Sequence, residues 1–334
     1  MEHPSDSYIR TRVAILAARL IEQQSWPGII ESDLEALQQQ FHTVIDSSAH
    51  ESVEKQLIDQ ALTDFQLLFR PFSGSSREML NHAAHWYELT NLKTLIRGKF
   101  SGMSQSEIRH QLIDLKQFAV LPLNTLLEAD DPYEMLRLLE STPYSNIVRQ
   151  ARTVFEDEQN LFALDSAIDR HFFRGLRHRI RFLPVADQRP FSTLYGTVMD
   201  RLNLLWLVRY RFSYHLSPAK SYYHLATEGN KLHSTTLMKL AQLETLQELI
   251  DQLPSPLNHL LRQVKNLSDI EILMEHYTLS AARKALKQST SVLTRVYCYV
   301  VLRESEIRSL QAVFKGKALK LNQKLIYKAV EGTY

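Results

Sequence analysis

Along most of this chain, apolar positions recur at intervals of three and four residues. One strip runs through Leu80, Ala84, Tyr87, Asn91 and Leu95, the spacing that places side chains on one face of a helix. The alternating pattern of a half-buried strand, bounded by turn residues, is hard to find. The pattern therefore predicts a nearly all-α protein.

Capping residues indicate where several of these helices begin. A Ser followed three residues later by Glu can satisfy the first backbone N–H groups of a helix from both directions. Asp131 followed by Pro132 is also typical of a helix start, because proline at the first helical position loses no hydrogen bond. Capped starts are expected at four Ser/Glu pairs: Ser32/Glu35, Ser75/Glu78, Ser104/Glu107 and Ser268/Glu271.

One segment, ELTNLKTLIRGKF at 88–100, returns as DRLNLLWLVRYRF at 200–212. Five of the thirteen positions are identical, and a weaker third copy at 306–317 carries Glu306 where the others carry Asn. A helical segment used in each third of the chain predicts three similar helical subdomains around a pseudo-threefold axis. Chance similarity between Leu-rich helices is the alternative. If each subdomain ends after its copy, the three subdomains span residues 1–103, 104–217 and 218–334.

The repeated Asn needs a physical reason, because an amide in the middle of a Leu-rich helix face is costly unless it is hydrogen-bonded. We expect the signature residues Asn91, Asn203 and Glu306 to bond to the backbone of a neighbouring helix and fix its register. Basic residues end each copy, where cations suit the helix dipole. These are Arg97, Lys99, Arg209, Arg211, Lys315 and Lys317. Equivalent positions in three units would present positive charge toward a common axis or face.

Composition limits the compartment and the kind of membrane contact. Charged residues make up 23% and hydrophobic residues 44% of the 334 residues, which is ordinary for a folded soluble protein. Cys298 is the single cysteine, so no internal disulfide can form; a buried thiol in a reducing cytoplasm is expected. No apolar run approaches the roughly 18–20 residues of a membrane span, and the start lacks a signal-peptide pattern. Any association with a membrane is therefore expected through a partner or the surface.

Catalytic and ligand-binding motifs are missing from the sequence. There is no glycine-rich phosphate loop and no nucleophile elbow, so neither nucleotide binding nor serine catalysis is predicted. His82 and His85 would share a helix face, but zinc needs two further ligands in reach. We expect a surface or interface pair there, and no catalytic residue, metal or cofactor.

Two basic clusters have sharper alternatives than a solvated surface. The run from Arg170 to Arg181 interleaves arginines with aromatic residues, so a helical adaptor that binds nucleic acid or protein remains a competing hypothesis. The net charge of +2 gives no general attraction to a polyanion. Lys320, Lys324 and Lys328 form a stripe at helical spacing, for which contact with a protein or an anionic surface is the alternative.

Several segments, in order along the chain, resemble one known family. The stretch WYELTNLKTLIRGKFSG at 86–102 is similar to its signature, in which NLK is followed by aliphatic residues and Arg. Further resemblances lie at 8–13, at LLEA (126–129) leading to STPY (141–144), at AIDRHFF (167–173), and from Glu304 to Lys317. The family is that of the C subunit of the archaeal and bacterial V-type (A/V-type) ATPase, which is called the d subunit in the eukaryotic enzyme. Gly98, where the family often has Ala, and the aromatic segment around Trp206 depart from its pattern.

This resemblance implies a funnel-shaped, non-catalytic central-stalk subunit of a rotary ATPase. It would sit on the cytoplasmic end of the membrane proteolipid ring, one copy per complex, and receive the foot of the central shaft made of D-type and F-type subunits. It would turn with the rotor and pass torque between ATP hydrolysis or synthesis and proton or sodium transport. On this interpretation the six basic positions contribute to the docking faces, and neither a cofactor nor nucleic acid is expected as a ligand.

Overall fold

A computed structural model describes residues 4–43, 53–142, 144–146, 148–149 and 161–333. Within these ranges the chain is helical, and β pairing is confined to an isolated bridge between Glu228 and His233. The all-α prediction is confirmed. In the same ranges, no helix is long and apolar enough to cross a bilayer.

Three long helices carry the repeated segments. They are α5 (Gly74–Phe100), α11 (Val185–Val208) and α17 (Val292–Ala318). The second copy runs past the end of α11 into a π-helical turn, η3 (Arg209–Ser213). The second copy therefore ends in wider helical turns than the α-helical end of the first.

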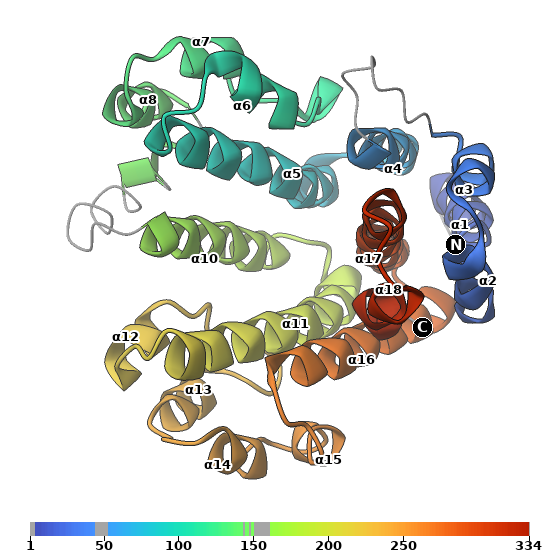
Figure 1. Ribbon diagram of the computed structural model, residues 1–334. Coiled ribbons are helices and arrows are strands. Elements are labelled where there is room, and N and C mark those ends of the chain that lie inside the picture. Colours follow the sequence, from blue (N-terminus) through green and yellow to red (C-terminus); the bar gives the residue numbers. More distant parts are fainter. Residues whose placement is uncertain (1–3, 44–52, 143, 147, 150–160, 334) are drawn as a thin grey trace.

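Two of the long helices are each followed by short helices and then by a returning helix that packs along them (Figure 1). The returning helices are α10 (Leu161–Ile180), which packs on α5, and α16 (Leu267–Gln288), which packs on α11. Between α5 and α10 the short elements are α6 (Gln105–Gln111), η2 (Lys116–Phe118), α7 (Leu123–Glu128) and α8 (Pro132–Leu139). Between α11 and α16 they are α12 (Pro218–Tyr223), α13 (Ser234–Ala241), α14 (Leu246–Asp251) and α15 (Leu257–Leu260).

The third long helix packs with segments from the N-terminal part of the sequence. α17 packs on α1, α3 and α4, while α18, which follows it, packs on α2; Figure 1 shows these blue and red segments side by side. The bounds are α18 (Gln323–Val330), η4 (Glu331–Thr333), α1 (Pro4–Ala17), η1 (Gln23–Ser25), α2 (Trp26–Glu31), α3 (Leu34–Phe41) and α4 (Val53–Phe69).

This grouping differs from the boundaries predicted at 103 and 217. Those boundaries separate α5 and α11 from the short helices that follow them, although side chains of both helices bond to the following segments, as described below. The boundaries at 103 and 217 stay a prediction, since α16 packs on α17 as well as on α11. For description we group each long helix with the segments that it holds: the described parts of 74–180, of 185–288, and of 292–333 together with 4–69.

Several helix starts differ from the prediction by one or two residues. Ser104 and Glu107 form the predicted capping box, and Asp131 caps α8 as expected. At α3 the cap is Asp33 rather than Ser32, and at α16 it is Asn266 rather than Ser268. Asp and Asn are at least as good as Ser at this position, so the Ser-x-x-Glu pattern lost to a stronger capping residue nearby. α5 begins directly after Ser73, which leaves Ser75 inside the helix.

The core consists of two apolar clusters. The larger is formed by α5, α10, α17 and the elements around them, and the smaller lies between the end of α11 and α13–α16. Cys298 is fully buried in the larger cluster, which confirms the expected core thiol. Burial raises the pKa of this thiol to about 12, so it is a poor nucleophile at neutral pH.

Candidate functional site

The repeated asparagines anchor the segment that follows the first short helix of their unit. Asn91 is buried, and its amide donates to the Ile113 carbonyl at 2.7 Å while its oxygen accepts from the Ile113 N–H at 2.8 Å. Asn203 accepts from the Ala226 N–H at 3.1 Å. The partners lie in irregular segments between helices rather than in a neighbouring helix as predicted. The amides therefore fix how each chain segment returns along its long helix.

Three residues before each Asn, a buried carboxylate holds the same segment further along. Glu88 accepts from the N–H groups of Val120 and Leu121 at 2.5 and 2.6 Å. Asp200 accepts from the Leu232 N–H at 2.8 Å. Burial raises the pKa of Asp200 to about 6, even though the backbone N–H groups around it act to lower that pKa. A carboxylate and an amide thus form a two-point anchor in both units.

In the third unit the carboxylate of this anchor is Glu306, which the sequence comparison aligned with Asn91 and Asn203. Glu306 accepts from the Ile21 N–H at 2.5 Å, and its second oxygen pairs with Arg303. This is the contact that Glu88 and Asp200 make, so Glu306 matches the carboxylates and not the asparagines. The third copy must therefore be shifted by three residues relative to the predicted alignment. In the shifted alignment, Ser309 occupies the position of Asn91 and Asn203.

Two glycines support this register. A Cβ on Gly98 would lie 2.5 Å from Cγ1 of Ile108, and a Cβ on Gly316 would lie 2.6 Å from Cγ1 of Ile326. In both units the buried Ile follows the Gly by ten residues and packs directly on the long helix. Ala at position 98 would require Ile108 to move, which explains why this chain departs from the family pattern there.

The structure divides the six predicted docking residues into two kinds. Lys99 donates to the carbonyls of Leu127 and Ala129 at 2.6 and 2.5 Å, at the end of α7. In the second unit, Arg211 donates to the carbonyls of Leu216 and Leu243, at 2.7 and 3.0 Å. A cation at carbonyl groups near a helix end stabilises the fold of its own unit. Lys99 and Arg211 are therefore internal ties in the same place of two units.

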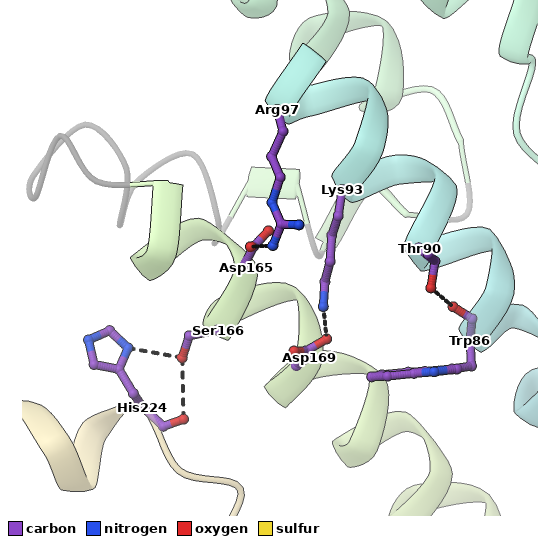
Figure 2. A network of polar contacts seen from close by, with 8 residues as sticks. All are labelled: Trp86, Thr90, Lys93, Arg97, Asp165, Ser166, Asp169 and His224. Atoms are coloured by element: carbon purple, nitrogen blue, oxygen red, sulfur yellow. Dashed lines mark hydrogen bonds and ion pairs between the residues drawn. The ribbon is translucent and has the colours of Figure 1, made fainter. Parts of the chain in front are cut away.

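The remaining basic positions lie closer to the solvent. Arg97 is ion-paired with Asp165 of α10 and keeps 59% of its side chain exposed (Figure 2). Arg209 is half-buried and Lys315 is exposed. These three occupy the same position in the three copies of the repeated segment, two residues before Lys99, Arg211 and Lys317 respectively. Lys317 is half-buried.

Helix α10 makes polar contacts with α5 of its own unit and with the second unit (Figure 2). On one side, Asp169 pairs with Lys93 of α5. On the other, the Ser166 hydroxyl lies 3.1 Å from Nδ1 and 3.3 Å from the backbone oxygen of His224, which follows α12. Burial raises the pKa of Asp169, and Lys93 opposes that rise. The helix is therefore bonded to both neighbours along its length.

Two arginines of the basic cluster from Arg170 to Arg181 also contact the second unit. Arg170 is buried, donates to the Tyr223 carbonyl and lies 4.4 Å from the centre of the Tyr223 ring. Arg177 donates to the Ser192 hydroxyl at 3.0 Å. These two arginines are therefore tied to neighbouring segments, whereas Arg174 and Arg181 of the same cluster are exposed.

His82 and His85 lie within the protein between α5 and α10. The His82 ring stacks on Phe172 with centroids 4.8 Å apart, and its Nε2 lies 3.1 Å from the Phe172 carbonyl oxygen. Burial, followed by the charge of Arg179, lowers the pKa of His82 to about 3. The pair is thus part of a helix–helix contact. In the described part of the chain, no group of three or more His, Cys, Asp or Glu side chains is arranged to hold a metal.

A central pocket, which the sequence did not indicate, lies where long helices of all three units meet. Its volume is about 100 Å³. The carboxylate of Glu275, on α16, accepts three hydrogen bonds in this pocket. It accepts from Arg201 at 2.7 Å, and from Arg308 and Ser305 at 2.6 Å each. The other lining side chains come from α5, α10, α11, α16 and α17 and include Trp86, Phe172, Phe173, Leu202, Tyr297, Val301 and Glu304.

The two carboxylates of this pocket have opposite shifts in pKa. Burial alone would raise the pKa of Glu275, but Arg308 and Arg201 outweigh it and lower that pKa to about 2. Burial raises the pKa of Glu304 to about 7, against the attraction of the same two arginines. Glu275 is therefore ionised at neutral pH, whereas burial favours the protonated form of Glu304. The residues stand 74 and 30 positions apart along the chain (Arg201–Glu275 and Glu275–Ser305), so no local motif could reveal the pocket.

Comparison with known proteins gives a consistent result over most of the chain. The sequence model of the family described as ATP synthase (C/AC39) subunit matches residues 9–329. The chain is 24% identical over 331 residues to the C subunit of the A-type ATP synthase of Methanocaldococcus jannaschii, covering 93% of this chain and 82% of that protein. It is 28% identical over 253 residues to the protein of the same name from Halorubrum lacusprofundi, covering 73% and 71%. For the Methanosarcina mazei protein the identity is 21% over 338 residues, covering 96% and 91%.

Proposed function

The chain belongs to the ATP synthase (C/AC39) subunit family, and from this premise we propose that it couples the central shaft of the enzyme to the membrane rotor ring. As a member of this family it is a non-catalytic subunit of a rotary ATP synthase. In the proposed role it transmits torque between ATP hydrolysis or synthesis and proton or sodium transport. Its partners are the D-type and F-type shaft subunits and the proteolipid ring, on the cytoplasmic side and with one copy per complex.

The observation that carries the proposal is the repeated construction of the three long helices. Each holds a backbone segment of its own unit through a buried carboxylate three residues before Asn91, Asn203 or Ser309. Three units built in this way suit a funnel with a pseudo-threefold axis, because a part placed between a shaft and a ring must carry load around a common axis.

The exposed cations at the ends of these helices are the residues proposed for docking. Arg97, Arg209 and Lys315 remain available toward the solvent to different degrees, whereas Lys99 and Arg211 are tied to carbonyls of their own units. Equivalent positive charges in three units would attract acidic surfaces of a partner and steer its approach. We therefore assign docking to the first three, which hold the same position in the three copies, and expect Lys317 to contribute less because it holds the position of the internal ties Lys99 and Arg211.

Co-purification tests this assignment. The chain is co-expressed with the D-type and F-type subunits of the same organism, and separately mixed with the purified ring. The wild type is expected to form a stoichiometric complex, which Arg209→Glu/Lys315→Glu weakens while its circular dichroism spectrum is unchanged. The matched control is Lys239→Glu/Lys284→Glu, which changes the net charge equally at exposed positions elsewhere. A folded wild type that binds neither shaft nor ring contradicts the function, and unchanged assembly of the docking variant contradicts the residue assignment.

A further inference from the structure

The turn between α17 and α18 exposes three leucines beside a set of lysines. Leu319, Leu321 and Leu325 are 60%, 45% and 57% exposed. We call these residues, together with the exposed lysines around them, the C-terminal corner. The lysines are Lys320, Lys324 and Lys328.

The backbone of this corner closely matches that of the turn between α5 and α6. The Leu321 N–H donates to the Gly316 carbonyl at 2.8 Å, and the Met103 N–H donates to the Gly98 carbonyl at 2.9 Å. In both turns the following short helix then packs its Ile onto that glycine. The two corners therefore have the same local structure and can be compared residue by residue.

That comparison shows that two of the three exposed leucines, Leu319 and Leu325, are not needed for folding, whereas Leu321 takes the place of Met103, which packs against the core. The positions of Leu319 and Leu325 are occupied by Ser101 and Glu107 in the α5–α6 corner, which keeps the same turn and the same helix start. A side chain that can be polar without loss of the turn gains nothing for the fold by being apolar. Exposed apolar side chains grouped in one place indicate a surface that is covered by something else.

The charge of the corner identifies the chemistry of what covers it. From 315 to 330 the sequence contains five lysines and neither Asp nor Glu. Two acidic residues border this segment: Glu331, which follows α18, and Glu31 of α2, which accepts from the Tyr327 hydroxyl at 3.1 Å. The exposed surface between them is thus positive, and it complements a negatively charged partner.

Composition favours a lipid surface over a protein. Protein interfaces are depleted in lysine and enriched in Arg and aromatic side chains, and the exposed part of this corner has neither. Leucines flanked by lysines are instead typical of segments that lie in the interface of an anionic bilayer. There the apolar side chains enter the acyl boundary, while the lysine stems extend to bring their ammonium groups to the headgroups.

We propose that the C-terminal corner binds the surface of an anionic membrane, with Leu319, Leu321 and Leu325 inserted and the surrounding lysines on the headgroup phosphates. This contact is additional to docking on the shaft or ring. It gives the protein a point of lipid contact of its own beside the ring. Because it needs no other subunit, it can be tested on the purified chain, and its failure is distinguishable from failure of the co-purification above.

Vesicle flotation of the full chain provides the test. The wild type is expected to float with vesicles of phosphatidylcholine and phosphatidylglycerol at low salt, to bind phosphatidylcholine alone at least about tenfold less, and to dissociate as salt is added. Leu319→Ser/Leu325→Glu, which introduces the residues of the α5–α6 corner, should weaken binding at least about tenfold. Lys320→Gln/Lys324→Gln should weaken it on anionic vesicles and reduce the salt dependence.

The control variant is Leu67→Ser/Met238→Ser, which removes exposed apolar side chains elsewhere and should bind like the wild type. The proposal is overturned if the wild type does not float, if it binds neutral and anionic vesicles equally, or if the control loses as much binding as the leucine variant. If the wild type does not float but the leucine variant fails to bind the purified ring, the corner is a protein contact instead. Thermal unfolding of each variant establishes that it is folded.

Discussion

Replacing Glu275 by Gln isolates the charge at the centre of the three units. The side chain is 15% exposed and pairs with Arg201 and Arg308, which lie on different long helices. These arginines hold the pKa of Glu275 at about 2, against 4.5 for an unperturbed Glu. At 1.36 kcal/mol for each unit of pKa, this difference corresponds to about 3 kcal/mol of stability for the ionised form. Gln keeps the shape and loses the charge, so Glu275→Gln should lower the free energy of unfolding at neutral pH by about that amount.

The pH dependence of this loss separates charge from packing. Because the folded protein favours the carboxylate, the stabilisation is complete above about pH 4.5 and is lost as the pH falls toward 2. Urea unfolding followed by circular dichroism, at pH 7 and at several values down to about pH 3, measures the gap between wild type and variant. Glu271→Gln removes the same charge from an exposed position on the same helix and should have little effect. Equal stability of the two variants at pH 7, or a Glu275→Gln deficit that does not shrink at low pH, would refute the electrostatic account.

Three further outcomes are expected. Glu304→Gln should raise the melting temperature relative to wild type at about pH 8 and leave it nearly unchanged at about pH 4, because the raised pKa of about 7 makes the folded state less stable once this carboxyl ionises. Asn91→Ala should reduce stability by about 2–4 kcal/mol and Asn203→Ala by about 1–2 kcal/mol in urea titrations, since Asn91 satisfies two buried backbone groups and Asn203 one; equal losses would contradict this. Cys298 should react with a thiol reagent only at the rate of unfolding, so rapid labelling of the native protein would show that the described burial is wrong.

The sequence predicted the helical class and the repeated helix well, because both depend on local patterns. Apolar spacing of three and four residues survives in the buried face of α5, and the Asn91/Asn203 pair marks equivalent anchors. The third copy was harder to align. Glu306 was matched with the asparagines because the surrounding Ile and Leu spacing fits two registers, and only the hydrogen bond to Ile21 separates them.

The parts that sequence could not supply depend on long-range contacts. The boundaries at 103 and 217 followed from the position of the repeat alone, whereas the grouping of the helices depends on which segments return to each long helix. The different roles of Lys99 and Arg97 also depend on long-range contacts. Lys99 is tied internally only because carbonyls about thirty residues away lie within its reach. The central pocket draws its charges from three helices that no short motif connects.

The joining of α1–α4 to α17 has a consequence for how the chain folds during synthesis. Trp26, Ile30 and Leu37 are made early but are buried in a unit that includes α17, which is made more than two hundred residues later. Contacts over such a distance form slowly, because a long loop of chain must close before they contribute. The segment synthesised first is thus expected to become ordered last, and until then its apolar side chains are open to aggregation or to a chaperone.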